Sequence, residues 1–566
     1  MKKQSIKALA LIAISSAFVT SCDLLKDLNY KVTPSPLEMH ADSVRVKVEV
    51  MFPEKGIKKK ASAEITPMLG TTALKTVTVQ GEKVSGNGTV IQYKPGGKMV
   101  YTDVVAYKPE FENAELMVTG KVFKGGKEKK DKFKDTKIAD GTIITPYLVA
   151  KNFKVIYEKD AFVRTNEKSY VAQINFEKGK SVVKPAELKD KDMVDFVNWM
   201  KSAETNPKIA IKSINITGYA SPEGEVGKND NLSLERATAA KTASKELAKK
   251  VESTAGQLEI YNLVGKGEDF DGFKKELQAS SINEDEKNLV IRVLEMHKDP
   301  TMRETEMRNM GKTFTELDKD IFPKLRRSEI STVYDLTGYT DEELIAVTIS
   351  NPDILSVEEL LFAATLTNDL NEKERLYTIA TKNYATDHRV FNNLGVVNFY
   401  QNKVADALMN FEKANNIKDN AIAKNNLAAI AGLKGDRSKA AKLLAQAKGA
   451  GSEVSYNIGI INIQSAKYAD AIANFGAEAS YNKALAQLLN NSSTEAIKTI
   501  DLSLDKESAR GYYLKAIAAA RMDKSEAVMS NLKNAISKDA SYKMKAAKDR
   551  EFLKFATNTS FMSIAK

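Results

Sequence analysis

Apolar and polar residues alternate one by one in the first quarter of the chain. The run 44–50 has valine at every second position, with Arg45, Lys47 and Glu49 between the valines, which is the period of a strand with one buried face. Similar runs cover 74–80, 89–93, 99–106 and 116–123, and glycine turns at 86–88 and 95–97 separate them. Short strands at this spacing predict an all-β sandwich over residues 36–155.

The pattern changes to mixed strand-like and helix-like runs between residues 165 and 337. Strand-like runs at 171–176, 209–217 and 258–264 alternate with helical periods at 188–201 and 232–250. Arg326-Arg327-Ser328-Glu329-Ile330 opens a closing strand, and a helical insertion is predicted at about 273–322. This order predicts an α+β domain over 165–337.

From residue 340 to residue 566 the chain is alanine-rich and helical, and its pattern repeats. Windows that begin at Leu360, Leu394, Leu427 and Ile458 lie 34, 33 and 31 residues apart. Gly395 is followed by Phe411 at the offset that separates Ala428 from Leu444, so that a small residue on one helix admits a large one from the next. The period resembles the tetratricopeptide repeat and implies an all-α solenoid whose concave surface binds protein partners. A generic helical bundle is the alternative.

The first 22 residues have the pattern of a secretory signal that ends in cysteine. Lys2, Lys3 and Lys7 precede an apolar run at 8–19, which is too short to cross a bilayer, and Cys22 follows three small or apolar residues. The segment resembles a bacterial lipoprotein lipobox. The resemblance implies removal of residues 1–21, acylation of Cys22 with palmitate-type chains that enter membrane lipid, and a tether at 22–35. An ordinary signal peptide that happens to contain a cysteine is the alternative.

Composition narrows the classes of function. The chain has 566 residues, one cysteine and a net charge of +11, so no internal disulfide can form. Removal of the three signal lysines leaves about +8 (11 − 3). The densest basic run, 125–132, is predicted to be a hairpin tip, although binding to anionic glycan or lipid headgroups stays open. The export signal disfavours nucleic acid as a partner.

Candidates for catalysis are weak. His40, His297 and His388 are isolated from one another, and the sequence has neither a Walker loop nor a G-x-S-x-G elbow. The run 268–272 spaces its carboxylates like part of a calcium loop but lacks the other ligands, so an acidic turn is the simpler interpretation. We therefore predict that the protein is not an enzyme and needs no cofactor or metal.

Linked motifs in the central segment carry a second family resemblance. Gly218-Tyr219-Ala220-Ser221-Pro222-Glu223-Gly224 follows a strand, and residues 229–237 read N-x-x-L-S-x-x-R-A at the start of a helix. With the glycine-rich run 265–269 and the R-R-x-E-I motif at 326–330, they resemble the OmpA C-terminal-like, peptidoglycan-associated domain.

The resemblance implies a pocket for the peptide stem of peptidoglycan. In that family a turn aspartate pairs with the amine of diaminopimelate, and a helix arginine holds its carboxylate. Arg236 matches the arginine, whereas Ser221 stands at the aspartate position and Glu223 is the nearest substitute. Asn229 completes the candidate set. Arg236 also has a structural interpretation, as an arginine that packs the turn, and Ser233 is interpreted as a helix-start hydroxyl.

Together these resemblances predict an outer-membrane lipoprotein scaffold, with the periplasmic face favoured over the cell surface. Its central domain would touch peptidoglycan, and its repeats would recruit envelope proteins. The alternative is a subunit of a larger envelope or surface complex, in which the OmpA-like domain binds protein because Ser221 has replaced the wall ligand.

Overall fold

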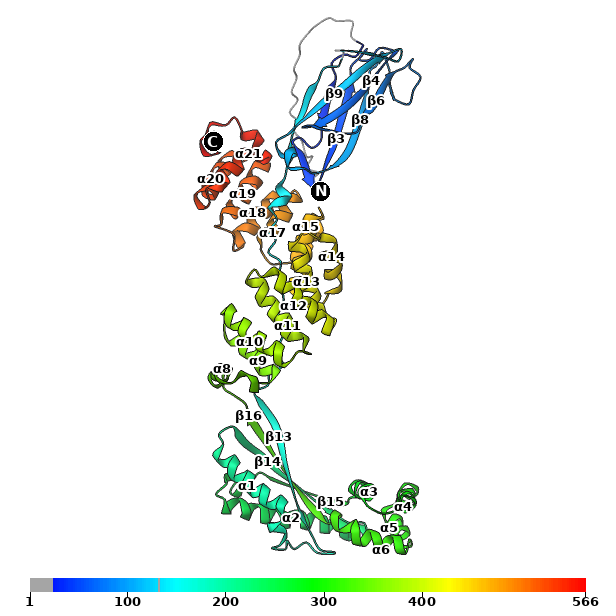
Figure 1. The fold of residues 1–566 in the computed structure, drawn as a ribbon, viewed down its shortest axis with the longest axis vertical. Coiled ribbons are helices and arrows are strands. Elements are labelled where there is room, and N and C mark those ends of the chain that lie inside the picture. Colours follow the sequence, from blue (N-terminus) through cyan, green and yellow to red (C-terminus); the bar gives the residue numbers. More distant parts are fainter. Residues whose placement is uncertain (1–23, 131–132, 566) are drawn as a thin grey trace, which may run out of the picture. The chain divides into compact units, whose positions relative to one another are not determined.

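The computed structural model describes residues 24–130 and 133–565. The predicted signal peptide and Cys22, the predicted lipidation site, lie outside the described residues. The chain divides into two compact units, one formed by Met1–Lys159 with Asp369–Lys566 and the other by Asp160–Asn368. The first unit holds a β-rich region and a helical solenoid, so the chain is multidomain as predicted (Figure 1).

The N-terminal region consists of two sheets. One has the order β1-β3-β2-β12 with β8 paired to β3, and the other has the order β10-β9-β4-β6-β7 with β11 on β9 and β5 on β4. The strands are β1 (Asn29–Val32), β2 (Leu37–His40), β3 (Ser43–Phe52), β4 (Ala61–Leu69), β5 (Thr72–Ala73), β6 (Val77–Gly81), β7 (Thr89–Ile91), β8 (Gly97–Ala106), β9 (Glu115–Lys124), β10 (Lys127–Lys129), β11 (Thr136–Asp140) and β12 (Thr142–Ile143).

One apolar core joins the two sheets. Val44, Val46, Val48 and Val50 of β3 are buried, as the alternation predicted, and share this core with residues of β4 and β9 in the other sheet. The described part of the predicted hairpin tip is a turn between β9 and β10. Gly125 and Gly126 form this turn with φ values of 59° and 75°. The last strand ends at Ile143 rather than near residue 155. A 3-10 turn at Thr145–Leu148 follows, and the chain then leaves the sheets.

The second unit is built on a four-stranded sheet of order β13-β16-β14-β15. Helices α1 (Lys191–Thr205) and α2 (Val226–Lys250) bury Met193, Phe196 and Ala237 in the same core as Ile174 and Ile216 of the sheet. The element order is the predicted one, although the elements extend further than their apolar runs. The strands are β13 (Thr165–Asn175), β14 (Ile209–Ala220), β15 (Tyr261–Glu268) and β16 (Arg327–Thr337).

The predicted helical insertion lies between β15 and β16 and has an apolar core of its own. Phe273, Leu294 and Phe322 are buried in this core. Its helices are α3 (Phe270–Ala279), α4 (Glu284–Met296), α5 (Pro300–Arg308), α6 (Lys312–Asp320) and α7 (Phe322–Leu325). After β16 the same unit continues with α8 (Asp341–Ser350) and α9 (Val357–Ala363), so the unit boundary falls near residue 368 and not at the predicted residue 340.

The solenoid of the first unit begins with α10. Its helices are α10 (Leu370–Asn383), α11 (His388–Tyr400), α12 (Val404–Ile417), α13 (Ala421–Leu433), α14 (Arg437–Gln446), α15 (Ser452–Gln464), α16 (Tyr468–Phe475), α17 (Tyr481–Leu489), α18 (Ser493–Leu502), α19 (Ala509–Arg521), α20 (Ser525–Lys538), α21 (Ser541–Lys548) and α22 (Thr559–Ala565). The predicted repeats therefore include a pair, α17 with α18, that the sequence pattern missed.

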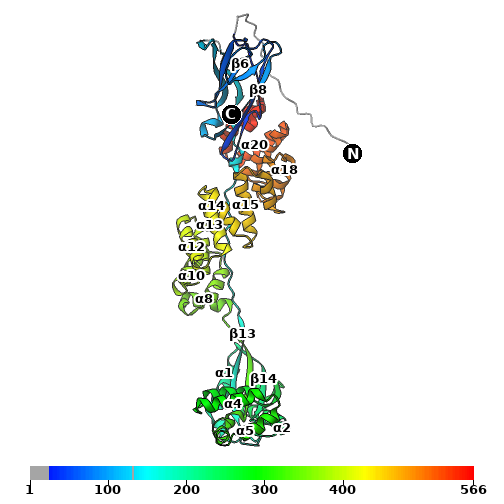
Figure 2. The same ribbon diagram turned by 90° about the vertical axis from the view of Figure 1, so that its right-hand side faces the viewer.

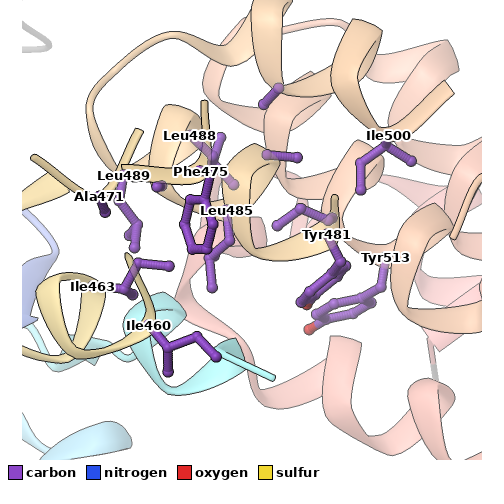
Figure 3. Packing of buried hydrophobic residues seen from close by; sticks show 14 of the residues in the cluster. Ile460, Ile463, Ala471, Phe475, Tyr481, Leu485, Leu488, Leu489, Ile500 and Tyr513 are labelled. Atoms are coloured by element: carbon purple, nitrogen blue, oxygen red, sulfur yellow. The ribbon is translucent and has the colours of Figure 1, made fainter. Parts of the chain in front are cut away.

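Small residues let the paired helices approach closely, as the sequence indicated. A Cβ atom added at Gly395 of α11 would lie 2.7 Å from the Phe411 ring of α12, and one added at Gly459 of α15 would lie 2.6 Å from the Phe475 ring of α16. Figure 3 shows how Phe475, Leu485 and Leu488 then fill the space between successive pairs. The packing of the paired helices therefore depends on size complementarity between a small residue on one and a large residue on the next.

We predict that Gly395→Ala lowers the free energy of unfolding of the solenoid by about 1–3 kcal/mol, because the added methyl group meets the Phe411 ring. Gly227→Ala is the matched control, since a Cβ atom at that helical position meets no atom within 4 Å. The control should be neutral or stabilise its unit by less than ~1 kcal/mol. Calorimetry of the full chain measures both, and equal effects of the two substitutions would contradict this account of the repeats.

Candidate functional site

A strap of extended chain, residues 149–158, runs along the solenoid after leaving the β-rich region. It belongs to no helix or strand. In Figure 2 it appears as a thin cyan trace beside helices α13 and α15. In the part of the chain that the structure describes, the main-chain groups of 150–158 bond to asparagine side chains of the solenoid and to no backbone group.

Four asparagines grip the main chain of the strap in the same way. In each pair the strap N–H donates to the side-chain Oδ1, and the side-chain Nδ2 donates back to the carbonyl of the same strap residue. The pairs are Asn482 with Ala150 (2.9 and 2.9 Å), Asn457 with Lys154 (2.8 and 2.7 Å), Asn426 with Ile156 (2.8 and 2.8 Å) and Asn393 with Glu158 (2.7 and 2.9 Å). A primary amide offers a donor and an acceptor that pair with the C=O and N–H of one residue. The contact therefore binds the main chain and does not select the side chain.

The asparagines recur once per repeat and are linked to one another. Asn393 and Asn426 hold the same place in α11 and α13, 33 residues apart. Asn426 Nδ2 donates to Asn392 Oδ1 (2.9 Å), and Asn457 Nδ2 donates to Asn425 Oδ1 (2.9 Å). All of them are almost completely buried. Helices α11, α13, α15 and α17 therefore present one continuous row of amides, which we call the binding face.

Two strap side chains enter the solenoid core. Phe153 and Val155 are 4% and 6% exposed and belong to the same apolar cluster as the repeat helices. Phe153 lies against Gly432 of α13, where any Cβ atom would overlap its ring. Tyr157 is half-buried near Tyr377 and Tyr400, with ring centroids 6.4 Å away in each case, and burial raises its pKa to about 12.

Between these apolar contacts the strap places charged and polar side chains. The Lys154 ammonium lies 4.3 Å from the Tyr456 ring centroid and 3.3 Å from Glu478 Oε1. Glu158 lies 3.5 Å from His388, and burial raises the pKa of Glu158 and lowers that of His388. Asn152 Oδ1 accepts hydrogen bonds from Tyr456 and Asn482. The binding face thus recognises both the backbone of the strap and several of its side chains.

The predicted partner-binding surface of the repeats is therefore filled, along these helices, by the chain itself. The sequence prediction assigned 149–155 to the sandwich and did not find the asparagine row. Asn-Asn pairs at 392–393 and 425–426, one repeat apart on apolar helices, were a signal that could have found it.

The predicted peptidoglycan residues of the central unit gather around one turn between β14 and α2. Arg236 is 1% exposed, and its three nitrogens donate to the carbonyls of Lys180, Tyr219 and Glu177 (3.0, 2.8 and 3.1 Å). Burial lowers its pKa to about 10. This geometry is that of the packing interpretation, in which the guanidinium ties α2 to the turn.

Glu223, the acidic candidate of this turn, also forms contacts within the chain. Arg326 donates through Nε to Ser221 Oγ (3.2 Å) and Glu223 Oε1 (2.9 Å), and through Nη2 to Asp318 of the insertion (2.8 Å). Arg308 of the insertion donates to the Glu223 carbonyl. A guanidinium of the chain therefore occupies the place at which a ligand ammonium would meet Glu223.

The remaining motif residues form the frame of the turn. Asn229 donates to the Ser221 carbonyl (3.1 Å) and to Glu268 Oε1 (2.8 Å). The expected helix-start role of Ser233 is wrong, because α2 begins at Val226, two turns earlier. Its hydroxyl donates to the Asp230 carbonyl and accepts from the Gly267 N–H (2.9 Å), which joins α2 to β15.

The acidic run 268–272, which the sequence indicated to be a turn, contains a helix cap. Asp269 Oδ1 accepts from the Gly272 N–H (2.8 Å) at the start of α3, and Asp269 Oδ2 lies 2.8 Å from Arg327 Nη1. Across residues 24–130 and 133–565, no group of three His, Cys, Asp or Glu side chains is placed to hold a metal ion. Within that same part of the chain, no helix has an apolar stretch long enough to span a bilayer.

Comparison with known proteins yields only distant similarities to solved structures. No protein-family model matches it, and no curated protein matches it as a relative. Similar solved structures are the Cut9–Hcn1 hetero-tetramer of the APC/C (11% identity, TM-score 0.33, 38% of this chain), a tetratricopeptide repeat protein from Parabacteroides merdae (15%, 0.29, 38% of this chain and 91% of that one) and yeast Tom70 (13%, 0.26, 65% and 72%). The chain spans 45% of the first. All three TM-scores are low, so these similarities assign neither a family nor a function to the chain.

We predict that Asn426→Ala destabilises the first unit by about 1–3 kcal/mol, because it leaves the partly buried N–H of Ile156 without its acceptor. Asn474→Ala is the control, since that side chain is only partly buried and bonds only within α16. Urea unfolding measures the stability, and hydrogen exchange at Ile156 should accelerate in the Asn426 variant alone. Unchanged protection of Ile156 would contradict the pairing.

The central unit should lose stability as the pH rises from mildly acid to alkaline. Burial and the neighbouring Glu304 raise the pKa of Glu268 to about 8, against an ordinary value of 4.5. The folded state therefore binds a proton that the unfolded chain has already released. The resulting stabilisation is complete below the ordinary value and is lost as the pH rises through the folded value.

Glu268→Gln should remove this component of the pH dependence and leave the unit more stable than the native chain at about pH 8.5. Glu246→Gln, on the exposed side of α2, is the control and should change neither property. Unfolding by urea at several pH values between about 5 and 8.5 makes the comparison. A Glu268 variant with the native pH dependence would contradict the raised pKa of Glu268 in the folded unit.

Proposed function

We propose that this protein is a non-catalytic, lipid-anchored scaffold of the bacterial cell envelope that works as a subunit of a larger protein assembly. The lipobox resemblance at Cys22 supports an acyl anchor in the outer membrane, with the body on the periplasmic face. The modular body, a β-sandwich, an α+β unit and tetratricopeptide-like repeats, supports binding rather than chemistry.

The observation that carries this choice is the internal pairing of the OmpA-like turn. Arg236 donates to three backbone carbonyls, and Arg326 holds Glu223. A wall ligand would have to break these buried contacts, which costs more than the exchange of exposed ones. This favours an OmpA-like domain that contributes to a protein assembly over one that grips peptidoglycan.

A link between outer membrane and peptidoglycan is the second candidate. It is favoured by the convergence of Ser221, Glu223 and Asn229 on one turn, as the family resemblance implied. The Glu223 side chain is 7% exposed, and its Oε2 has no hydrogen-bond partner among the described residues. A ligand ammonium would supply that missing donor.

One experiment on the full chain separates the candidates. A tagged protein, extracted from membranes in detergent, should bring down envelope proteins in fixed stoichiometry, and the purified protein should not pellet with isolated sacculi. Pelleting that Glu223→Gln abolishes, and that the control Glu225→Gln on the exposed edge of the turn does not, would establish the peptidoglycan link instead.

The anchor has its own test. Cys22→Ser should move the protein from the membrane fraction to the soluble periplasmic fraction, because acyl chains supply about 0.8 kcal/mol per buried methylene. Mass spectrometry of the native N-terminus should find acylated Cys22. A membrane-bound serine variant would overturn the lipid anchor and leave the other two tests unaffected.

A further inference from the structure

Part of the binding face is held together by contacts that do not involve the strap. Its helices form their own backbone hydrogen bonds, and the cross-links Asn426–Asn392 and Asn457–Asn425 lie between repeat helices and do not involve the strap. The amide row therefore keeps part of its hydrogen bonding when the strap leaves, so the face is organised in advance for an extended chain.

The strap, in turn, is bound as a peptide would be. It forms no sheet, and its main chain is read at alternate residues by side-chain amides. Main-chain pairing supplies affinity without specificity, as in strand-addition complexes, and the side-chain contacts then select the sequence.

Three adjacent strap residues make the side-chain contacts that select the sequence. Phe153 fits the space left by Gly432, Val155 is buried in the apolar cluster, and Lys154 meets the Tyr456 ring and Glu478. The face thus fits an extended segment with an aromatic residue, a basic residue and a β-branched residue in succession.

We propose that the binding face is a peptide-binding site for partner segments of this aromatic–basic–β-branched class, and that the strap is its built-in competitor. A partner segment enters when the strap is displaced. The proposal does not depend on the lipid anchor or on the assignment of the central unit.

The covalent connection of the strap to the rest of the chain explains why the strap occupies the face in the free protein. The strap belongs to the same chain as the face, so its binding is intramolecular and a free peptide of micromolar affinity competes with it poorly. The apparent affinity for a partner falls by the fraction of molecules whose face is open. Weakening the strap raises that fraction without altering the face.

The test uses a fluorescent synthetic peptide of residues 148–160 and the full-length protein. The native chain should bind the peptide weakly, whereas Phe153→Ala combined with Val155→Ala should bind it about tenfold more tightly or better, because the internal competitor is impaired. Adding Asn426→Ala and Asn457→Ala to that variant should abolish binding, and adding Asn474→Ala should not. A peptide with Phe153 replaced by Asp should not bind any of them.

Circular dichroism and thermal melting establish that each variant is folded. If the double strap variant unfolds, Phe153→Leu, which keeps an apolar side chain, takes its place and should bind the peptide more tightly than the native chain. The proposal is overturned if a folded strap variant binds no better than the native chain. It is also overturned if the asparagine substitutions leave binding intact.

Discussion

The pairing of asparagine amides with the main chain of the strap is the interaction on which the first unit depends. In sequence, the whole central unit lies between the strap and the solenoid. The strap itself belongs to no helix or strand. Four amides, each matched to both polar groups of one strap residue, satisfy a backbone that would otherwise be buried without partners. Phe153 and Val155 then add apolar contact to that frame.

The central unit follows the same principle at its predicted ligand site. Carbonyls of the chain engage the guanidinium of Arg236, and Arg326 engages the carboxylate of Glu223. The insertion contributes Asp318 and Arg308 to the same turn. In both units, most groups that could receive a ligand are paired internally, with Glu223 Oε2 as an exception, because buried polar groups left unpaired are costly.

Local periodicity predicted most of the elements because it reports burial directly. The valines of β3 alternate in sequence and are buried in the structure, and Gly395 faces Phe411 as size complementarity required. Where the period was interrupted, prediction failed. The short helices α17 and α18 escaped notice, and residues 149–155 were included in the sandwich although they form no strand.

The sequence by itself determined the order of the β-rich, α+β and helical segments, since hydrophobic periods and turn residues act over a few residues. It also indicated that Ser221, Glu223 and Asn229 lie together at the turn between β14 and α2. Only the tertiary structure decided what those residues bond to and what lies on the binding face. Hydrogen bonds such as Ile156 to Asn426 join positions hundreds of residues apart, and no local pattern specifies which distant backbone a buried amide will meet.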